Sequence, residues 1–427
     1  MGESVLTAAF PRHDGALACE QVPLETIAAA ADTPTYVYSA TFVREQYARL
    51  DRALAPVPHR LHYSAKANSN GALLALLHSL GAGVDIVSGG ELYRARRAGF
   101  SGADIVFSGV GKTARELREA LEAGILLVNV ESEGELRLLD RVAAESGVVA
   151  PVALRVNPEV TVDTPHHYTR TGERGHKFGI PMEEALDVAR LVLALPHVRL
   201  AGLDMHIGSQ IAAIDPYRLG LLRVLELHDE LRREGARDIR YLDIGGGLAV
   251  TYDTELPMDV DAFADAVLPS IAASGLELIV EPGRFLVGNA GVLLTRVLYT
   301  KRSGDREYVI VDAGMNDLLR PSHYNAYHRI EAVRPHDGRM VADVVGPVCE
   351  SGDFFALARE IDDVRPGDLV VVHSAGAYGF SMASTYNSRP RAAEVLVDGD
   401  RFAVVSEREC YEDLVRHEPS HLHWRMG

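Results

Sequence analysis

The chain has 427 residues, of which 47% are hydrophobic and 24% are charged, and its formal net charge is −17. This is ordinary globular composition, in a chain long enough for two or three domains. The negative charge makes nucleic acid or an anionic membrane surface a poor partner. The sequence contains no run of about 18 apolar residues, which argues against a membrane span.

The amino-terminal stretch and the cysteines indicate the compartment. The first 15 residues contain no basic segment followed by an apolar run, so we expect no secretory signal. The three cysteines, Cys19, Cys349 and Cys410, are widely spaced, and no pair has the spacing of metal ligands. This usage is typical of a reducing compartment. We therefore expect a cytoplasmic protein without a metal site.

Between residues 36 and 285, short apolar runs alternate with segments of helical periodicity. Eight runs predict strands: RLHYSAK, GVDIVS, ADIVFSG, ILLVNV, PVALRVN, LAGLDMHIG, IRYLDIGGG and LELIVEPG. Eight strands alternating with helices are typical of a closed parallel (β/α)8 barrel. An open doubly wound sheet has the same alternation, but the even length of the units favours closure.

After residue 286 the helical periodicity weakens. The strands predicted here are GVLLTRVLYT, REYVIVDAG, GRMVADVVG, GDLVVVHSAGAYG and AAEVLVDGDRFAVV. Within the last run, Asp398 and Gly399 are typical of a hairpin turn. We therefore expect a mostly β domain over residues 286–427, whereas residues 1–35 fit neither pattern.

Lys66 lies in the stretch RLHYSAKANSN, at the end of the first barrel strand. Alternation places it on the same face as His62 and Ser64, just before a predicted helix. A lysine at the end of a sheet is usually a surface residue. At the mouth of a barrel it can instead be an amine for covalent catalysis.

Other unusual residues lie at the ends of the remaining strands, where barrels of this kind place their chemistry. They are Asp85 in the second strand, Arg155 in the fifth, HIGSQ after the sixth, GGG after the seventh and EPGR after the eighth. A glycine triplet lets backbone N–H groups approach an anion, and barrels often bind phosphate after strands seven and eight. A tight turn alone explains the triplet equally well.

A phosphate site beside a lysine suggests pyridoxal 5′-phosphate, bound as an imine to Lys66. This cofactor is an electron sink, and it works best with a protonated ring nitrogen. Glu281 in EPGR is a carboxylate that can hold that proton. His206 in HIGSQ could lie against the ring, or it could be an ordinary hydrogen-bonded histidine at a strand end.

The motifs together resemble the diaminopimelate decarboxylases, pyridoxal enzymes of the alanine-racemase-like fold. They are YSAKAN, HKFGI, HIGSQ, DIGGGL, EPGR, DAGMNDLLRPSHYNAYH, GPVCESGDFF and AGAYGFSMASTYNSRPRAAEVLVDG. The resemblance covers nearly the whole chain. Ornithine, arginine and carboxynorspermidine decarboxylases share only the short barrel motifs.

The resemblance implies a carboxy-lyase (EC 4.1.1.20) that converts meso-2,6-diaminopimelate to L-lysine and CO2, the last step of bacterial lysine biosynthesis. The alternative is a decarboxylase of the same fold for ornithine, arginine or carboxynorspermidine. The resemblance also implies that residues 1–35 join the β domain. It further implies a cytoplasmic homodimer in which Cys349 and Glu350 reach across the two-fold interface.

The resemblance assigns roles to individual residues. Lys66 would carry the cofactor, His206 would stack on its ring, and Glu281 would hold the proton of the ring nitrogen. Cys349 would protonate the carbanion left after CO2 departs. Further cofactor contacts would come from Asp85, Arg155, Ser209, Gly246, Gly247, Pro282, Gly283, Arg284 and Tyr386. Substrate contacts would come from Arg284, Arg320, Tyr324, Glu350 and Tyr386.

The residues disfavour several competing hypotheses. A non-catalytic cofactor carrier would lack the β domain and Cys349, and a regulatory pseudo-enzyme would have lost Lys66 or Cys349. A racemase would place an arginine at the ring nitrogen, where Glu281 is available here. Arg320 separates the possible substrates, because a guanidinium fork suits the distal carboxylate of diaminopimelate. Diamine-forming relatives place an acid there.

Overall fold

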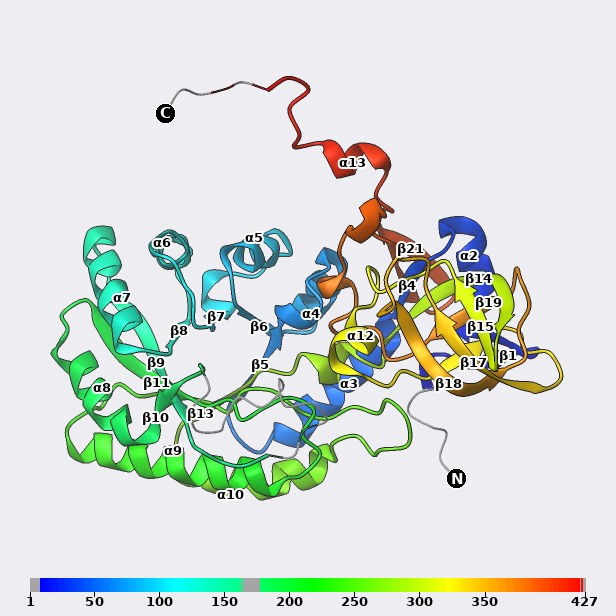
Figure 1. Ribbon diagram of the computed structural model, residues 1–427. Helices are drawn as coiled ribbons and strands as arrows, with labels where there is room; N and C mark the ends of the chain where they lie inside the picture. The colour runs from blue at the N-terminus through cyan, green and yellow to red at the C-terminus, as the bar shows by residue number, and fades with distance from the viewer. Residues whose placement is uncertain (1–7, 163, 165–176, 423, 425–427) are drawn as a thin grey trace. The chain divides into compact units, whose positions relative to one another are not determined.

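The computed structural model describes residues 8–162, 164, 177–422 and 424 (Figure 1). Within these residues the chain divides into two compact units. The barrel unit is Ala40–Ala290, and the β unit combines the described residues up to Ser39 with those from Gly291 onward. The sequence predicts these boundaries after residues 35 and 285, a few residues earlier in each case.

Eight parallel strands form the wall of the barrel unit. They are β5 (His59–Ser64), β6 (Gly83–Ile86), β7 (Ile105–Phe107), β8 (Leu127–Val130), β9 (Ala150–Asn157), β11 (Val198–Asp204), β12 (Tyr241–Asp243) and β13 (Glu277–Val280). Each pairs with the next, and β13 pairs back to β5, with Ile279 opposite Arg60. The closed barrel is therefore confirmed, and the open doubly wound sheet is wrong.

Helices separate consecutive strands and lie outside them (Figure 1). They are α3 (Ala40–Leu54), α4 (Gly71–Ser79), α5 (Gly89–Arg97), α6 (Ala114–Glu122), α7 (Glu133–Ser146), α8 (Met182–Ala194), α9 (Asp215–Arg233) and α10 (Val260–Ser274). The short elements of this unit are η1 (Ala65–Ala67), η2 (Gly102–Asp104), β10 (Ile180–Pro181) and α11 (Arg284–Val287). Among the described residues, none of the helices has the length and apolar character needed to span a membrane.

The inner face of the barrel changes character along the strands. Val106, Leu127, Ala153, Ala201 and Ile279 form a buried apolar cluster. Such a layer of packed side chains is the usual filling of a closed barrel. Two residues further along several of these strands the inner face becomes polar, so the barrel has an apolar base beneath a polar layer at its carboxyl end.

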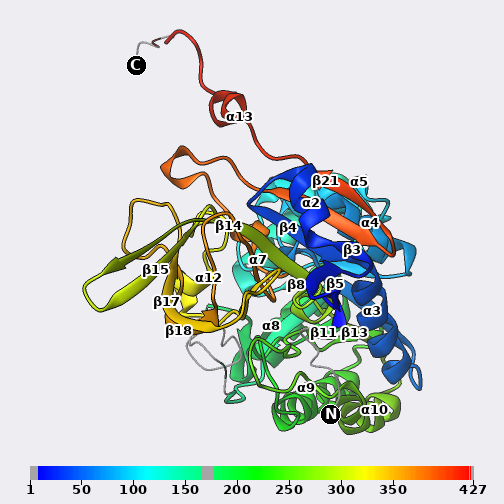
Figure 2. The ribbon, with the colours of Figure 1, turned by 90° about the vertical axis from the view of Figure 1, so that its right-hand side faces the viewer.

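The β unit is built on a long, mostly antiparallel sheet (Figure 2). The strands in spatial order are β18 (Phe354–Asp362), β17 (Arg339–Val345), β15 (Arg306–Val311), β14 (Gly291–Ser303), β4 (Thr35–Ser39), β20 (Ala393–Asp398) and β21 (Arg401–Ser406). β19 (Leu369–Val372) pairs with β14 and with β16 (Ile330–Ala332). The predicted mostly β character of this region is confirmed.

Smaller elements complete the β unit. A three-stranded sheet comprises β1 (Arg12–His13), β2 (Ala16–Cys19) and β3 (Val22–Pro23), and the helices are α2 (Leu24–Ala31), α12 (Arg320–Tyr324), α13 (Tyr411–Val415), η4 (Phe380–Met382) and η5 (Tyr386–Ser388). The predicted hairpin between β20 and β21 is confirmed, since Asp398 pairs with Arg401 and Gly399 has a φ of +67°. Glycine adopts this conformation at little cost.

Three strands of this sheet differ from the sequence prediction, and one of them is the three-residue β16, which was not predicted. β4 includes residues 36–39, which the prediction places in the barrel, but it pairs with β14 and β20. β18 was not predicted at all. Its sequence FFALAREID has charged residues in its second half, and much of it is exposed, so it lacks the apolar run of a buried strand.

Candidate active site

Each barrel strand contributes at least one buried polar side chain at or just after its carboxyl end. These side chains, which we call the polar layer, are Ser64, Asp85, Ser108, Asn129, Arg155, Asp204, Asp243 and Glu281. Ser64 pairs with Asp85 in the strand register, and Asp204 pairs with both Arg155 and Asp243. Neighbours in register lie on the same face of a parallel sheet, so these groups meet inside the barrel.

Hydrogen bonds connect the polar layer across the barrel. Asn129 Nδ2 donates to Ser108 Oγ at 3.2 Å and lies 3.4 Å from Asp243 Oδ2. Ser108 Oγ in turn donates to Glu281 Oε1 at 3.2 Å. The sequence singled out only Asp85, Arg155 and Glu281 from this layer. The other members carry only an ambiguous signal in the sequence, because a polar residue near the end of a predicted apolar strand has no evident role until the strand register is known.

Lys66 lies at the opening above the polar layer. Strand β5 ends at Ser64, so the lysine belongs to the turn η1 and not to the strand itself as predicted. Its Nζ lies 2.9 Å from Asp85 Oδ2, and its side chain remains 31% exposed whereas Asp85 is fully buried. Ser64 Oγ donates to the same carboxylate oxygen at 2.9 Å. A buried carboxylate therefore holds the amine in place while leaving it accessible.

Glu281 lies in a cluster of buried carboxyl groups. One oxygen from each of Asp204, Asp243 and Glu281 lies within 4.8 Å of the others. Burial and Asp85 raise the pKa of Glu281 to about 7, although Lys66 opposes this shift. Burial and Glu281 also raise the pKa values of Asp204 and Asp243. Carboxylates this close cannot all ionise together, so the cluster retains protons near neutral pH.

Arg155 is a positive charge within this acidic environment. Its Nη1 donates to Glu131 Oε1 at 2.8 Å, and its Nε lies 3.9 Å from Asp204 Oδ2. Burial works against the charged form, but Glu131 and Asp204 more than compensate, so the pKa of Arg155 is raised. Glu131 is fixed in turn by the amides of Gly109 and Gly179, at 2.9 and 3.0 Å. The guanidinium is thus held rigidly in the layer.

His206 lies just beyond β11, in the HIGSQ loop. Burial, together with Arg155 and Lys66, lowers the pKa of His206 well below its ordinary value. The imidazole is therefore neutral at physiological pH. A Cβ atom on Gly245 would lie 2.6 Å from His206 Nδ1, so the first glycine of the triplet leaves room for this ring.

The glycine triplet is required by the close approach of three loops. Gly245 and Gly247 have φ values of +69° and +92°, which favour glycine. A Cβ atom on Gly246 would lie 2.2 Å from the carbonyl oxygen of Glu281, and one on Gly247 would lie 2.2 Å from that of Gly208. Loop packing accounts for these glycines, and their contact with a phosphate stays a prediction.

The EPGR loop lies against the turn that carries Lys66. A Cβ atom on Gly283 would lie 3.0 Å from Ser64 Cβ and 3.1 Å from Ala67 Cβ. After Pro282 and Gly283, Arg284 begins α11 and is buried. Its Nη2 donates to Ser209 Oγ at 3.1 Å, and its Nη1 donates to the Tyr252 hydroxyl. Ser209 and the EPGR residues, predicted separately from the sequence, therefore converge within the barrel unit.

The remaining predicted residues lie in the β unit. Cys349 and Glu350 are exposed, and the backbone amide of Cys349 donates to Asn387 Oδ1 at 2.8 Å. The Tyr386 hydroxyl is hydrogen-bonded to Glu350, and this bond raises the pKa of Tyr386. The loop that carries the Cys349 thiol is therefore held to the segment of Tyr386. The side chains of Cys349 and Glu350 are both exposed.

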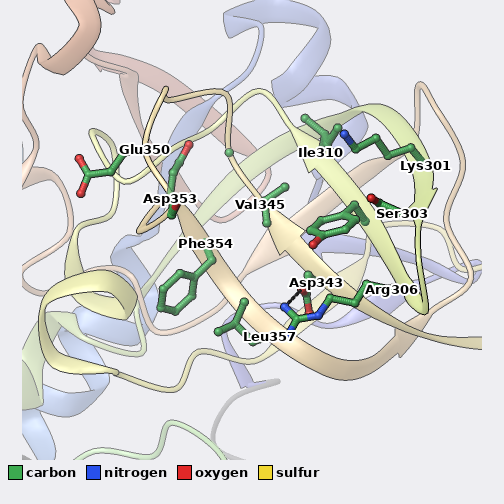
Figure 3. Close-up of a pocket in the computed structure, with 13 residues that line it drawn as sticks. Lys301, Ser303, Arg306, Ile310, Asp343, Val345, Glu350, Asp353, Phe354 and Leu357 are labelled. Atoms are coloured by element: carbon green, nitrogen blue, oxygen red, sulfur yellow. Dashed lines mark hydrogen bonds and ion pairs between the residues drawn. The ribbon is translucent and has the colours of Figure 1, made fainter.

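Glu350 also borders a pocket of about 490 Å³ in the β unit (Figure 3). Arg306 and Asp343 line the same pocket and form an ion pair of 3.2 Å (Figure 3). Phe354 and Leu357 of β18 supply apolar surface to this pocket. The carboxylate of Glu350 is thus next to an open space of the β unit.

Arg320 begins α12 and is buried. Its Nε donates to His328 Nε2 at 3.4 Å, and its guanidinium carbon lies 5.7 Å from the centre of the Tyr324 ring. Because His328 accepts at Nε2, its proton is on Nδ1, which donates to the carbonyl oxygen of His373 at 2.8 Å. Arg320 is therefore a positioned charge and not a surface arginine.

The predicted residues therefore form two groups, one in each unit. The barrel group is Lys66, Asp85, Arg155, His206, Ser209, Gly246, Gly247, Glu281, Pro282, Gly283 and Arg284. The β-unit group is Arg320, Tyr324, Cys349, Glu350 and Tyr386. The motif HKFGI begins at His176, which lies outside the described residues.

Comparisons with known proteins agree with these features. Residues 41–288 match the family model described as pyridoxal-dependent decarboxylase, pyridoxal binding domain. Diaminopimelate decarboxylases of Aquifex aeolicus and Pseudomonas aeruginosa are 46% and 48% identical, over 96% and 95% of this chain and 96% and 97% of their own lengths. The crystal structure of diaminopimelate decarboxylase from Helicobacter pylori complexed with L-lysine has a TM-score of 0.89 at 38% identity, covering 92% of this chain and 99% of that chain. The chain thus belongs to the diaminopimelate decarboxylase family of pyridoxal-dependent decarboxylases.

Proposed function

We propose that this protein is a pyridoxal-phosphate-dependent carboxy-lyase that converts meso-2,6-diaminopimelate to L-lysine and CO2 (EC 4.1.1.20), the last step of bacterial lysine biosynthesis. The observation that carries the proposal is Lys66, an accessible amine held by buried Asp85 within the domain that matches the pyridoxal-binding family. The relatives named above support the substrate, since the solved structure of one holds L-lysine.

The residues at the barrel mouth fit pyridoxal phosphate. An accessible lysine for its aldehyde, a neutral imidazole and a buried carboxyl group lie at one end of the barrel. The loops of Ser209, Gly246, Gly247 and Arg284 pack together at the same end and can supply donors to a phosphate. The bound cofactor supplies an electron sink for the bond that breaks when CO2 leaves.

Asp85 would prepare Lys66 for covalent attachment. An ammonium group must lose its proton before it can act as a nucleophile, and its reference pKa is about 10.4. Asp85 Oδ2 lies 2.9 Å from Lys66 Nζ and stabilises the ammonium, so Asp85 would hold the amine in position, and the proton would leave to solvent on the exposed side of Lys66. Glu281 would then face the ring nitrogen and hold its proton, and His206 would cover the ring without adding a competing charge.

Substrate groups would be bound mainly by the β-unit residues. Arg320 would bind the distal carboxylate of diaminopimelate with its planar fork, and Tyr324 packs against that guanidinium. Glu350, Tyr386 and Arg284 would bind the remaining polar groups. The Cys349 thiol would deliver a proton to the carbon that has lost CO2.

We also propose that the working protein is a cytoplasmic homodimer whose subunits exchange Cys349 and Glu350. The exposure of these two residues supports a role at a surface that a second subunit covers. The cytoplasmic location is supported by the three cysteines, all of which are free thiols.

Product analysis with a panel of amino acids tests this function. The purified protein, supplied with pyridoxal phosphate, should convert meso-diaminopimelate to equal amounts of L-lysine and CO2. Ornithine, arginine and carboxynorspermidine should be turned over at least about 10⁴-fold less efficiently, because each lacks the distal carboxylate that Arg320 is expected to bind. If the protein preferred any of these three, the proposed substrate would be wrong. Only the more general assignment, a pyridoxal-dependent decarboxylase, would then remain.

A further inference from the structure

Two buried carboxyl groups of the polar layer, Asp204 and Asp243, have no part in the proposed function. Both are almost completely buried, at 2% and 0% exposure. Both lie beside Glu281, the residue expected to face the ring nitrogen of the cofactor. Ionised groups are buried at a high cost unless they are paired, so these two acids call for an explanation.

The charges in and around the polar layer do not balance. Five carboxyl groups meet there, those of Asp85, Glu131, Asp204, Asp243 and Glu281. Among the described residues, the cations that pair with these acids are Lys66 and Arg155, and the nearby His206 is neutral. At least one of the five acids must therefore keep its proton at neutral pH.

The ion pairs among the described residues leave two of the five acids without a paired cation. Lys66 pairs with Asp85, and Arg155 pairs with Glu131 and lies near Asp204. Neither Asp243 nor Glu281 forms an ion pair with a described cation, but Lys66 and Arg155 favour the ionised form of Glu281, whereas Asp243 faces the carboxyl groups of Glu281 and Asp204. Burial, Glu281 and Asp204 all raise the pKa of Asp243, and the amide of Gly245, which donates to its Oδ1 at 2.9 Å, works in the other direction.

Asp243 and Glu281 share a hydrogen bond, which lowers the pKa of Glu281 and raises that of Asp243. Because Lys66 and Arg155 favour the ionised form of Glu281 and no described cation pairs with Asp243, Asp243 is the donor of this bond. We propose that Asp243 is a positioning residue that keeps a proton and donates it to Glu281, so that Glu281 presents an ionised carboxylate to the ring nitrogen of the cofactor. This inference rests on the proposed function.

The consequence is that the proton between Glu281 and the cofactor stays on the ring nitrogen and not on Glu281. A hydrogen bond to an ionised group stabilises that form by roughly 10- to 100-fold. Without the donor, Glu281 becomes more basic and draws the ring proton onto itself, which weakens the electron sink. Loss of the donor should therefore lower kcat at constant KM.

Two variants test whether Asp243 acts as a hydrogen-bond donor to Glu281 or only fills space in the barrel. Asp243→Asn keeps the shape and an N–H donor, whereas Asp243→Ala removes the donor. Each is loaded with cofactor that carries 15N at the ring nitrogen, whose chemical shift reports its protonation. In the wild type and in Asp243→Asn the ring nitrogen should be protonated at pH 7. In Asp243→Ala it should move toward the unprotonated value, with kcat reduced roughly 10-fold or more and KM within about twofold.

A second measurement needs only the wild type and the isosteric variant. The infrared difference spectrum between wild type and Asp243→Asn, both labelled with 13C-aspartate, should show one protonated carboxyl band at pH 7 that belongs to Asp243. A missing band, or a protonated ring nitrogen in Asp243→Ala, would overturn the inference and leave the proposed function intact. Failure of the wild type to bind pyridoxal phosphate would instead overturn the proposed function.

Discussion

The two groups of candidate site residues are built in opposite ways. In the barrel unit, Asp85, Arg155 and Glu281 are buried and joined by ion pairs and hydrogen bonds. In the β unit, Cys349 and Glu350 are exposed. A buried network is rigid and already shaped before a ligand binds. An exposed group takes its catalytic environment from whatever covers it, such as substrate or a second subunit.

This difference separates two kinds of variant. Changes in the barrel group should alter cofactor binding and stability, because they leave buried charges without partners. Changes at the exposed residues should spare the fold and the cofactor and alter only the reaction. Arg320 is an intermediate case, since it is buried but belongs to the β unit.

The largest effect is expected from Lys66→Ala. This change removes the amine that is proposed to hold the cofactor, so lysine formation should fall below detection and no covalent cofactor adduct should form. The matched control is Lys301→Ala, which removes an exposed lysine of the β unit. The control should keep full activity, and substantial residual turnover in Lys66→Ala would show that the amine is not essential.

Arg320→Ala should lose diaminopimelate decarboxylation by roughly 10⁴-fold, because a site built around a polar group rejects a mismatch strongly. The absorbance of the bound cofactor should be unchanged, since Arg320 is expected to contact the substrate and is not among the expected cofactor contacts. Arg320→Lys keeps the charge but not the planar fork, and should recover only part of the loss. Near-normal kcat/KM in Arg320→Ala would contradict the substrate assignment.

Cys349→Ala should reduce lysine formation by roughly 10²–10⁴-fold, the usual contribution of a positioned proton donor. Cofactor binding and the denaturation midpoint should stay as in the wild type, because the thiol is exposed. Cys410→Ala is the control, as this cysteine is also exposed. Equal lysine yield and rate in Cys349→Ala and Cys410→Ala would show that the thiol is not the donor.

Mixing two inactive variants tests the shared site. If each site borrows Cys349 from its partner, Lys66→Ala and Cys349→Ala subunits that exchange freely should form mixed dimers with one intact site. An equal mixture should then regain up to about a quarter of wild-type activity. No recovery, under conditions where subunit exchange is verified by mass, would indicate sites built from a single chain.

The pH dependence of stability gives the smallest effect. The pKa of Glu281 is raised from 4.5 to about 7, so the folded protein holds this proton more tightly than the unfolded chain. Its contribution to stability is present at low pH and is lost as the pH rises through that range. Glu281→Gln imitates the protonated form.

In the cofactor-free protein, Glu281→Gln should therefore be more stable than the wild type above pH 7, by about 3 kcal/mol, with little difference near pH 4. Urea denaturation at a series of pH values measures this. A difference that is constant with pH would mean that Glu281 is not the group that titrates.

The sequence was sufficient for the barrel because each of its eight strands is an apolar run bounded by helices. It was insufficient for β18, whose charged residues interrupt the run, and for β4, whose partners β14 and β20 lie more than 250 residues away. Pairing over such separations depends on the whole fold and leaves no local pattern.

Within the site, sequence motifs located Lys66 and the EPGR loop, because unusual residues at strand ends are distinctive. Asp204, Asp243 and Asn129 were missed, since one polar residue in an apolar strand is ambiguous until the strand register places it beside others. The contact between Arg320 and His328 also cannot be predicted from the sequence. The position of His328 depends on its hydrogen bond to the carbonyl oxygen of His373, in another part of the chain.

The central claim is that Lys66 binds pyridoxal phosphate covalently at the mouth of the barrel. Borohydride reduction of the cofactor-loaded wild type, followed by mass mapping of its peptides, tests this claim most directly. We expect a loss of the visible absorbance and a single reduced cofactor adduct on the peptide that contains Lys66. An adduct on any other lysine, or an unmodified Lys66 peptide after complete loss of the absorbance, would contradict the account.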